Sequence, residues 1–395
     1  MSSIIQERLG RDGGSFADAV KPLSHAWTLP PWCYTSREFY DFEVRNVLMN
    51  DWVCVGRADQ VPKPGDYMTM RLFGEPLVVV RDLDGQVRVL STVCRHRGME
   101  VVQGQGNLRN FECPYHAWTY SLRGELMGAP EMGKSAGFDR KSCALPSLPL
   151  EQWEGFLFVN LDGTAAPLAP RLAPLSEQIR NWRPSEMQAL PPLVYECPWN
   201  WKVMVENFIE CYHHLGLHRQ SIEPAMPGRM TWTEEWNGQW VIVHLPTVNE
   251  QVGLSGDKGL SSDTPFPTIQ TLDAQQRREG VIVVVLPIQL MFMLPDSMVY
   301  YHVFPEDVDR ITLRITVCVP PESRALPDFE SRFQMAIKGI ETFNSEDMQA
   351  CASVQRGLSS RYAAPGRYSH LEDPVWQVGR FVAERIQAAL RTAAA

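Results

Sequence analysis

The 395-residue sequence has no hydrophobic run that approaches the roughly 18 residues of a membrane span, and it has no block of lysine and arginine. Its 37 basic and 46 acidic residues give a formal net charge of −9, which disfavours nucleic acid and anionic membrane surfaces as partners. The N-terminal stretch MSSIIQERLGRDGG lacks the long apolar core of a secretion signal. We therefore expect neither nucleic-acid binding nor membrane association.

The nine cysteines are an odd number scattered along the chain, which argues against the disulfide framework of a small secreted protein. A reducing, cytoplasmic location is therefore expected. No glycine-rich dinucleotide fingerprint follows a strand pattern, so the chain is not expected to oxidise NAD(P)H itself. The composition, with 44% hydrophobic and 21% charged residues, is that of a globular protein, and the length indicates two or three domains.

The first half, after a leader of some forty residues, reads as short strands broken by turn signals. Residues 77–80 and 87–90 flank Asp84-Gly85, a strong hairpin signal, and residues 120–127 predict a second hairpin. We therefore expect a small all-β domain between residues 52 and 158. Prolines at 167, 170, 174, 191 and 192 then mark a crossing to the next domain.

The second half mixes helix and strand patterns. Residues 200–218 have a helix-like pattern, and residues 230–245 read as two strands around a turn. Residues 281–320 are rich in Val, Ile, Met and Tyr, which predicts antiparallel strands. Apolar residues recur at helical spacing over residues 329–358. An α+β fold with a curved sheet and long helices follows.

Two short loops in the β half carry metal-ligand residues. Cys94 and His96 are followed, after sixteen residues, by Cys113 and His116. Each loop pairs one Cys with one His, whereas common zinc modules place two Cys together and two His together. Two Cys on one iron and two His on the other is the ligand set of a Rieske [2Fe–2S] cluster. The cluster is favoured, with structural zinc as the alternative.

Small and aromatic neighbours suit these loops to a buried cluster. Gly98 and Pro114 permit tight turns. Tyr115 and Trp118 are expected to keep solvent away from the ligands.

A second group of ligand residues lies between Glu206 and His218. On an ideal helix His213 and His218 would be separated by about 140°, too far for one metal ion. Gly216 lies between them and predicts a break that brings both imidazoles onto one ion. His214 points in another direction and is expected to make a structural hydrogen bond.

Two histidines and one carboxylate form the facial triad of non-haem Fe(II) oxygenases, which leaves coordination positions open for O₂. Asp347 falls on the apolar stripe of the helix predicted over residues 329–358, where a carboxylate is costly unless it is paired or binds a metal. Glu346 lies about 100° away, toward solvent. Asp347 is therefore the candidate third ligand, and a buried ion pair with Arg356 is the alternative.

Glu210 lies one helical turn before His213. Its carboxylate could accept a hydrogen bond from the ring nitrogen of His213 that does not bind metal. The alternative is an ordinary solvated glutamate on a helix. A one-electron cluster together with an open iron site indicates oxygen activation fed by electrons from NAD(P)H through a separate reductase.

On these residues the chain resembles the catalytic α subunit of the Rieske non-haem iron oxygenases, the aromatic ring-hydroxylating oxygenase superfamily, over nearly its full length. The two Cys/His boxes, the Glu210-x₂-His213-x₄-His218 box and the later Asp347 occur in the family's order and approximate spacing, and residues 153–161 resemble the end of its Rieske domain. Most ring-dihydroxylating members carry Asp at the position of Glu210, with one more residue before it. The Asn-Phe-Ile-Glu-Cys-Tyr-His form is more similar to the quaternary-ammonium branch, which includes carnitine, glycine betaine and stachydrine oxygenases.

The resemblance implies an N-terminal segment, residues 1–45, that packs on the catalytic domain. It further implies a Rieske [2Fe–2S] domain over residues 46–165 and a helix-grip catalytic domain of the START and Bet v 1 type over residues 166–395. It also implies a homotrimer in which Glu210 links His213 to a cluster histidine, His116, of the adjacent subunit. The implied partners are an NAD(P)H-dependent reductase, with or without a ferredoxin, and a small-molecule substrate.

The substrate is less sharply indicated. A trimethylammonium group would need an aromatic cage, for which the sequence offers Trp232, Trp236, Trp240, Tyr300 and Tyr301. We expect monooxygenation, with N-demethylation of a quaternary amine favoured. Ring hydroxylation or dihydroxylation of an aromatic carboxylate is the alternative, for which the available cations are Arg229, Arg356 and Arg361.

Two other functional classes remain open at this point. One is a Rieske electron carrier with a degenerate catalytic domain, against which the intact His213, His218 and Asp347 argue. The other is a zinc-stabilised binding module with a helix-grip cavity, which would be colourless rather than reddish-brown.

Overall fold

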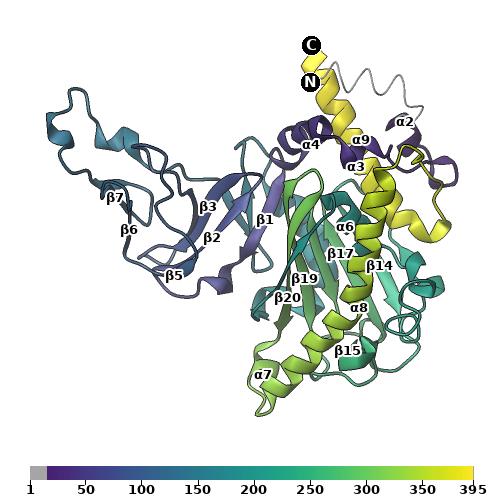
Figure 1. Cartoon of the computed structure of the whole chain (residues 1–395). Coiled ribbons are helices and arrows are strands. Elements are labelled where there is room, and N and C mark those ends of the chain that lie inside the picture. Colours follow the sequence, from purple (N-terminus) through teal and green to yellow (C-terminus); the bar gives the residue numbers. More distant parts are fainter. Residues whose placement is uncertain (1–15, 395) are drawn as a thin grey trace. The chain divides into compact units, whose positions relative to one another are not determined.

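The computed structural model describes residues 16–394, which divide into two compact units (Figure 1). Residues 49–170 form one unit, and the described residues up to Leu48 together with those from Arg171 onward form the other. The described part of the predicted N-terminal segment, residues 16–45, therefore belongs to the unit that holds the second ligand group. Residues 1–15 of that segment lie outside the described residues. All nine cysteines are free, and no described helix is long and apolar enough to cross a membrane.

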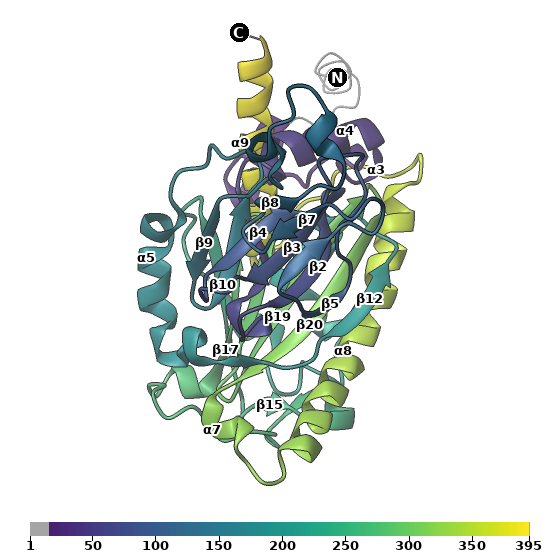
Figure 2. The same cartoon turned by 90° about the vertical axis from the view of Figure 1, so that its left-hand side faces the viewer.

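The unit of residues 49–170 is built from three antiparallel sheets, as expected for an all-β domain. The sheets have the orders β1-β10-β9, β4-β3-β2-β5 and β6-β7-β8, and the four-stranded sheet is seen in Figure 2. The strands are β1 (Trp52–Arg57), β2 (Asp66–Leu72), β3 (Glu75–Arg81), β4 (Val87–Ser91), β5 (Gln105–Asn107), β6 (Asn110–Glu112), β7 (Thr119–Ser121), β8 (Leu126–Gly128), β9 (Leu150–Trp153) and β10 (Phe156–Asn160). Both predicted hairpins, β3-β4 and β7-β8, are confirmed.

The other unit contains an open antiparallel sheet of eight strands, in the order β11-β20-β19-β18-β17-β14-β13 with β12 also paired to β20. Its strands are β11 (Gln188–Ala189), β12 (Leu193–Cys197), β13 (Trp232–Thr233), β14 (Trp240–Pro246), β17 (Glu279–Val285), β18 (Gln289–Met293), β19 (Met298–Asp307) and β20 (Arg310–Val319). A small two-stranded sheet joins β15 (Gly253–Leu254) to β16 (Leu260–Ser261). The strands predicted over residues 281–320 are confirmed.

Helices cover this sheet, and the longest of them crosses it (Figure 1). Helix α8 (Phe329–Leu358) has the bounds that its apolar spacing predicts, and it buries Phe333, Ile340 and Cys351. Helix α6 (Trp201–Ile209) contacts α8, α9 (Asp373–Ala394), β17 and β19. The other helices are α2 (Phe16–Ala19), α3 (Trp32–Thr35), α4 (Arg37–Glu43), α5 (Leu168–Ile179) and α7 (Pro321–Arg324).

A buried ion pair ties the N-terminal segment to α6. The ammonium of Lys202 lies 2.7 Å from a carboxylate oxygen of Glu43, and both side chains are fully buried. The same oxygen accepts a hydrogen bond from the indole of Trp201 at 2.8 Å. Because a buried charge is costly without a partner, this pair fixes α4 against the helix that leads into the second ligand group.

Candidate metal centres

The two Cys/His loops of the all-β unit have the same backbone closure. The N–H of Cys94 donates to the carbonyl of Met99, and the N–H of Gly98 donates to the carbonyl of Cys94. The second loop repeats both bonds, from Cys113 to Trp118 and from Ala117 to Cys113. Gly98 and Ala117 occupy the same place in their loops, and both have positive φ, +79° and +56°. Each loop therefore presents its Cys and His from an equivalent turn at a strand end.

The four candidate ligands form two pairs rather than one tetrahedral set. The Nδ1 atoms of His96 and His116 lie 3.1 Å apart, and the two cysteine side chains are buried and interact with each other. Across residues 16–394, the only group of three or more ligand atoms within 4.8 Å of one another lies elsewhere in the chain. An imidazole pair and a thiol pair fit a cluster with two irons better than one zinc ion.

Aromatic residues lie beside this group, and of the two predicted to exclude solvent Trp118 is buried whereas Tyr115 is exposed. Trp118 is buried and stacks on His96 with a centroid separation of 4.8 Å. Tyr115 is 52% exposed, and its ring lies against His116. Tyr120, which the sequence did not single out, accepts a hydrogen bond from the N–H of Arg95 and contacts the sulfur of Cys94 through its hydroxyl at 3.3 Å. A hydrogen bond to a cluster sulfur adjusts the reduction potential.

The second ligand group lies where helix α6 ends. The helix predicted over residues 200–218 is wrong in its extent, because α6 stops at Ile209 and Glu210 is extended, with φ −114° and ψ 160°. The predicted break at Gly216 therefore occurs six residues earlier, and a 3₁₀ turn over Tyr212–Leu215 follows it. The Glu210 carboxylate stabilises this turn by accepting hydrogen bonds from the N–H groups of Tyr212 and His213.

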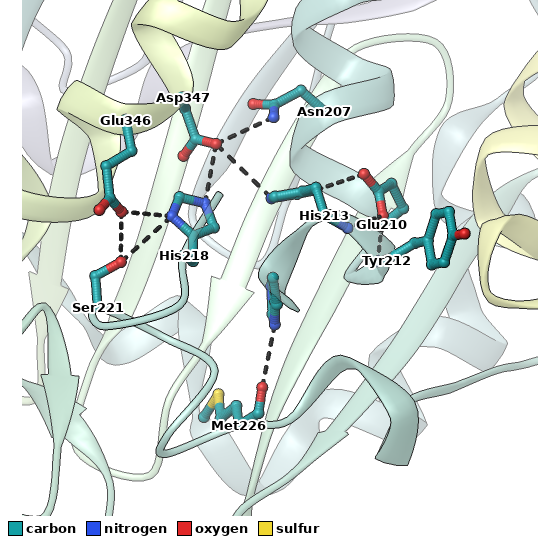
Figure 3. A network of polar contacts seen from close by, with 10 residues as sticks. Asn207, Glu210, Tyr212, His213, His218, Ser221, Met226, Glu346 and Asp347 are labelled. Atoms are coloured by element: carbon teal, nitrogen blue, oxygen red, sulfur yellow. Dashed lines mark hydrogen bonds and ion pairs between the residues drawn. The ribbon is translucent and has the colours of Figure 1, made fainter. Parts of the chain in front are cut away.

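Three side chains converge on one point, one from the 3₁₀ turn, one from the loop after it and one from α8 (Figure 3). Ligand atoms of His213, His218 and Asp347 all lie within 4.8 Å of one another. The Nε2 atoms of His213 and His218 are 3.8 Å and 3.0 Å from Oδ1 of Asp347, which also accepts a hydrogen bond from Asn207 at 3.0 Å. The shortened helix and the extended residue 210 explain how histidines five positions apart meet.

A carboxylate holds the far nitrogen of each imidazole. Nδ1 of His213 is hydrogen bonded to Glu210, as the sequence predicts. Nδ1 of His218 is hydrogen bonded to Glu346 at 2.7 Å, and the hydroxyl of Ser221 donates to the same oxygen. The sequence predicts that Glu346 points toward solvent. This prediction is wrong, because the side chain is only 32% exposed and bonds to His218. Such outer carboxylates fix the tautomer of a metal-binding histidine and leave Nε2 for the ion.

The electrostatics of this group favour a cation. Burial lowers the pKa of His218, but hydrogen bonds and charges from Asp347 and Glu346 outweigh it, so the pKa is raised above its ordinary value. Burial lowers the pKa of His214 to about 3, and its Nδ1 lies 3.1 Å from the carbonyl of Met226. The structural role predicted for His214 is confirmed.

Two alternatives from the sequence find no support. Arg356 is exposed, and the contacts of Asp347 that the structure shows are to the two histidines and Asn207 rather than to an arginine. Glu210 is not a solvated residue on a helix face, because its side chain is 13% exposed and bonded to His213. Two imidazoles and a carboxylate with Nε2 free are the donor set that Fe(II) takes in oxygenases, so the residues fit that ion.

A pocket opens beside the three ligands. The sheet contributes Leu245, Ile282, Phe292 and Tyr301 to its wall, and α6 contributes Phe208. Of the aromatic residues proposed as a cage from the sequence, Tyr301 alone is among the residues that line this cavity. Trp232 instead stacks on His244 with a centroid separation of 3.8 Å. The phase of the strands, which sequence alternation alone does not assign to a face, accounts for the difference.

Comparison with known families gives two matches that together cover most of the chain. Residues 184–388 match the family described as ring hydroxylating alpha subunit (catalytic domain). Residues 51–149 match the Rieske [2Fe–2S] domain.

Similar proteins include the carnitine monooxygenase oxygenase subunit of Acinetobacter baumannii, 29% identical over 349 residues that span 87% of this chain and 88% of that protein. The glycine betaine monooxygenase oxygenase subunit of Pseudomonas aeruginosa is 23% identical over 382 residues, which span 89% of this chain and 87% of that protein. Among solved structures, a quaternary ammonium Rieske monooxygenase is 26% identical with a TM-score of 0.81, covering 94% of this chain and 98% of that one. Naphthalene 1,2-dioxygenase from Rhodococcus sp. shares the fold, with 19% identity, a TM-score of 0.77 and coverage of 99% of both chains.

Proposed function

Because the chain belongs to the ring-hydroxylating alpha subunit family and carries a Rieske domain, we propose that this Rieske oxygenase monooxygenates a quaternary amine. The observation that carries the proposal is the second ligand group. His213, His218 and Asp347 converge with both outer imidazole nitrogens already bonded to carboxylates, beside a pocket with a largely apolar wall. The similarity to carnitine and glycine betaine monooxygenase subunits supports the choice of a quaternary amine.

In the proposal, His213, His218 and Asp347 hold Fe(II), while Cys94, Cys113, His96 and His116 hold the Rieske cluster. When bound, the cluster supplies single electrons and the mononuclear Fe(II) activates O₂. The fit of both donor sets supports these assignments, since each set matches its metal in residue type and in grouping.

The chain's own residues then have distinct tasks. Glu210 and Glu346 keep the His213 and His218 rings oriented with Nε2 toward the ion, and Asn207 fixes the third ligand by donating to Asp347. The apolar walls keep bulk water from the reacting centre. Tyr120 adjusts the potential of the cluster by its contact with Cys94.

The overall chemistry requires outside electrons. Hydroxylating a C–H bond next to nitrogen consumes O₂, two electrons and two protons and releases water. The hydroxylated product then collapses to a tertiary amine and releases a proton. The carbonyl product is formaldehyde when a methyl group is attacked and a larger aldehyde when a methylene group is attacked. The electrons come from NAD(P)H through a separate reductase, with or without a ferredoxin.

We further propose a homotrimer, in which Glu210 couples His213 to a cluster histidine, His116, of the neighbouring subunit. The part-exposed ring of His116 and the direct bond of Glu210 to His213 support this path. The nine free thiols support a reducing, cytoplasmic location. We also propose that residues 1–45 form an N-terminal segment that belongs with the catalytic domain. The Rieske domain then comprises residues 46–165, and the catalytic domain comprises residues 166–395.

A single-turnover experiment tests the function. The protein is reduced anaerobically and mixed with O₂ and one of a panel of quaternary amines or aromatic carboxylates, and cluster reoxidation and products are followed together. A quaternary amine should accelerate reoxidation and yield a tertiary amine together with formaldehyde or another aldehyde. Acceleration by aromatic carboxylates alone, with hydroxylated rings as products, would refute the quaternary-amine proposal and establish the ring-hydroxylating alternative.

A further inference from the structure

The pocket beside the three ligands has aromatic rings but no lysine or arginine among the described residues of its wall. Its charged lining residues are Glu210 and Asp347. The rest of the wall is largely apolar, with aromatic rings from α6, β18, β19 and α8: Phe208, Phe292, Tyr301 and Phe343. Asp347 and Glu210 are engaged by the two histidines of the metal site, so a substrate in this pocket would meet aromatic rings and no lysine or arginine.

Neither the buried lysine of this unit nor the arginines singled out in the sequence line the pocket. Lys202 is the one buried Lys or Arg of the unit's described residues, and its ammonium is already bonded to Glu43 at 2.7 Å. The three arginines that the sequence offered for a substrate carboxylate, Arg229, Arg356 and Arg361, are all exposed and absent from the cavity wall. A carboxylate in the cavity would thus have the iron as its sole cationic partner, and it would compete there with O₂ for open coordination positions.

The wall is well suited to a trimethylammonium group. Such a group is a weakly hydrated cation that is attracted to the faces of aromatic rings. The rings of Phe208 and Tyr301 lie 4.7 Å apart at an angle of 53°, so helix and sheet both contribute an aromatic surface. Gly280 makes room for a third ring, because a Cβ at that position would lie 2.6 Å from the ring of Phe292. A carboxylate would instead lose its hydration with no protein charge to replace it.

Resting on the proposed function, we propose that the substrate is a quaternary amine without a carboxylate, a trimethylammonium group on an apolar or hydroxylated chain. The chain would then differ from its carnitine and glycine betaine relatives, whose named compounds both carry a carboxylate. This proposed difference in substrate would arise from the residues of the cavity wall and not from the metal ligands. It would therefore change which molecule is oxidised and not the reaction.

Matched substrate pairs test this inference. γ-Butyrobetaine is compared with (4-methylpentyl)trimethylammonium, and glycine betaine with isobutyltrimethylammonium, since each pair differs by replacing the carboxylate with an isopropyl group of similar shape. The holoenzyme with its reductase is assayed for kcat/KM from formaldehyde and tertiary amine. We expect the carboxylate-free member to be favoured at least about tenfold, because a carboxylate that loses its hydration without a charged partner costs binding free energy. Equal rates, or a preference for the carboxylate, would overturn the inference while leaving the proposed function intact. Reaction with neither pair, but with aromatic carboxylates, would overturn both.

A converse variant places a cation in the wall. Phe292→Arg should shift the preference at least about tenfold toward γ-butyrobetaine, and Phe292→Met serves as the apolar control. Metal content and the cluster spectrum establish that each variant is folded. An unchanged preference in a Phe292→Arg protein that retains both metals would overturn the inference. If this variant does not fold, the substrate pairs assayed with the unmodified protein still test it.

Discussion

Glu346 gives the sharpest prediction about the iron site, because the structure assigns it a task that no spacing argument reveals. Its Oε2 atom accepts hydrogen bonds from Nδ1 of His218 at 2.7 Å and from the hydroxyl of Ser221 at 2.5 Å. Loss of such an outer-shell partner weakens metal binding by about 10- to 100-fold, or roughly 1.4 to 2.7 kcal/mol. The carboxylate is 32% exposed, and glutamine retains a carbonyl acceptor, so Glu346→Gln should cost about tenfold and Glu346→Ala about 100-fold.

Iron affinity is measured by competition with a chelator, and the cluster absorbance of the same molecules reports that the other metal centre is intact. Glu341→Gln, an exposed change on the same helix, is the matched control and should leave iron affinity unchanged. The reasoning is refuted if Glu346→Ala binds iron as tightly as the unmodified protein.

The buried charges of the catalytic unit give two further predictions. Burial raises the pKa of Asp296 to about 7 against about 3.9 in an unfolded chain, so the folded protein keeps a proton that the unfolded chain has lost. This contribution to stability falls by about 3 kcal/mol as pH rises from 5 to 8, and Asp296→Asn should abolish that fall in urea unfolding; a variant with the same pH dependence as the parent would contradict the assignment. Lys202→Met leaves Glu43 buried without a counter-charge and should lower the free energy of unfolding by about 3–5 kcal/mol. The double variant Lys202→Met/Glu43→Leu should restore most of this loss. Equal losses in the single and double variants would show that the uncompensated charge of Glu43 does not cause the destabilisation.

The ligand positions could be predicted from the sequence because they follow from periodicity and residue type. The apolar spacing of residues 329–358 gives the bounds of α8, and it places Asp347 on the inner face where the structure has it. The two Cys/His loops fall at strand ends because hairpin signals flank them. Each of these features is local in the chain.

What the sequence could not supply depends on side-chain reach and on strand phase. Glu346 points away from the apolar stripe by its angle, yet its long side chain bends back to His218, which arrives from a separate segment. The helix break lies at Glu210 because the carboxylate there bonds to backbone N–H groups ahead of it, and no glycine marks that position. Strand alternation leaves open which face of β13 and β14 meets the cavity, so the sequence predicts Trp232 in a cage that it does not join.

The central claim is that one chain holds a two-iron cluster and a separate iron on His213, His218 and Asp347. The most direct test is the iron content, cluster spectrum and single-turnover product of His213→Ala beside those of the unmodified protein. The account predicts about three irons per chain in the parent and about two in the variant, with an unchanged cluster spectrum and no oxidised product. A variant that keeps its third iron and its turnover would contradict the account, as would one whose cluster is lost along with the mononuclear iron.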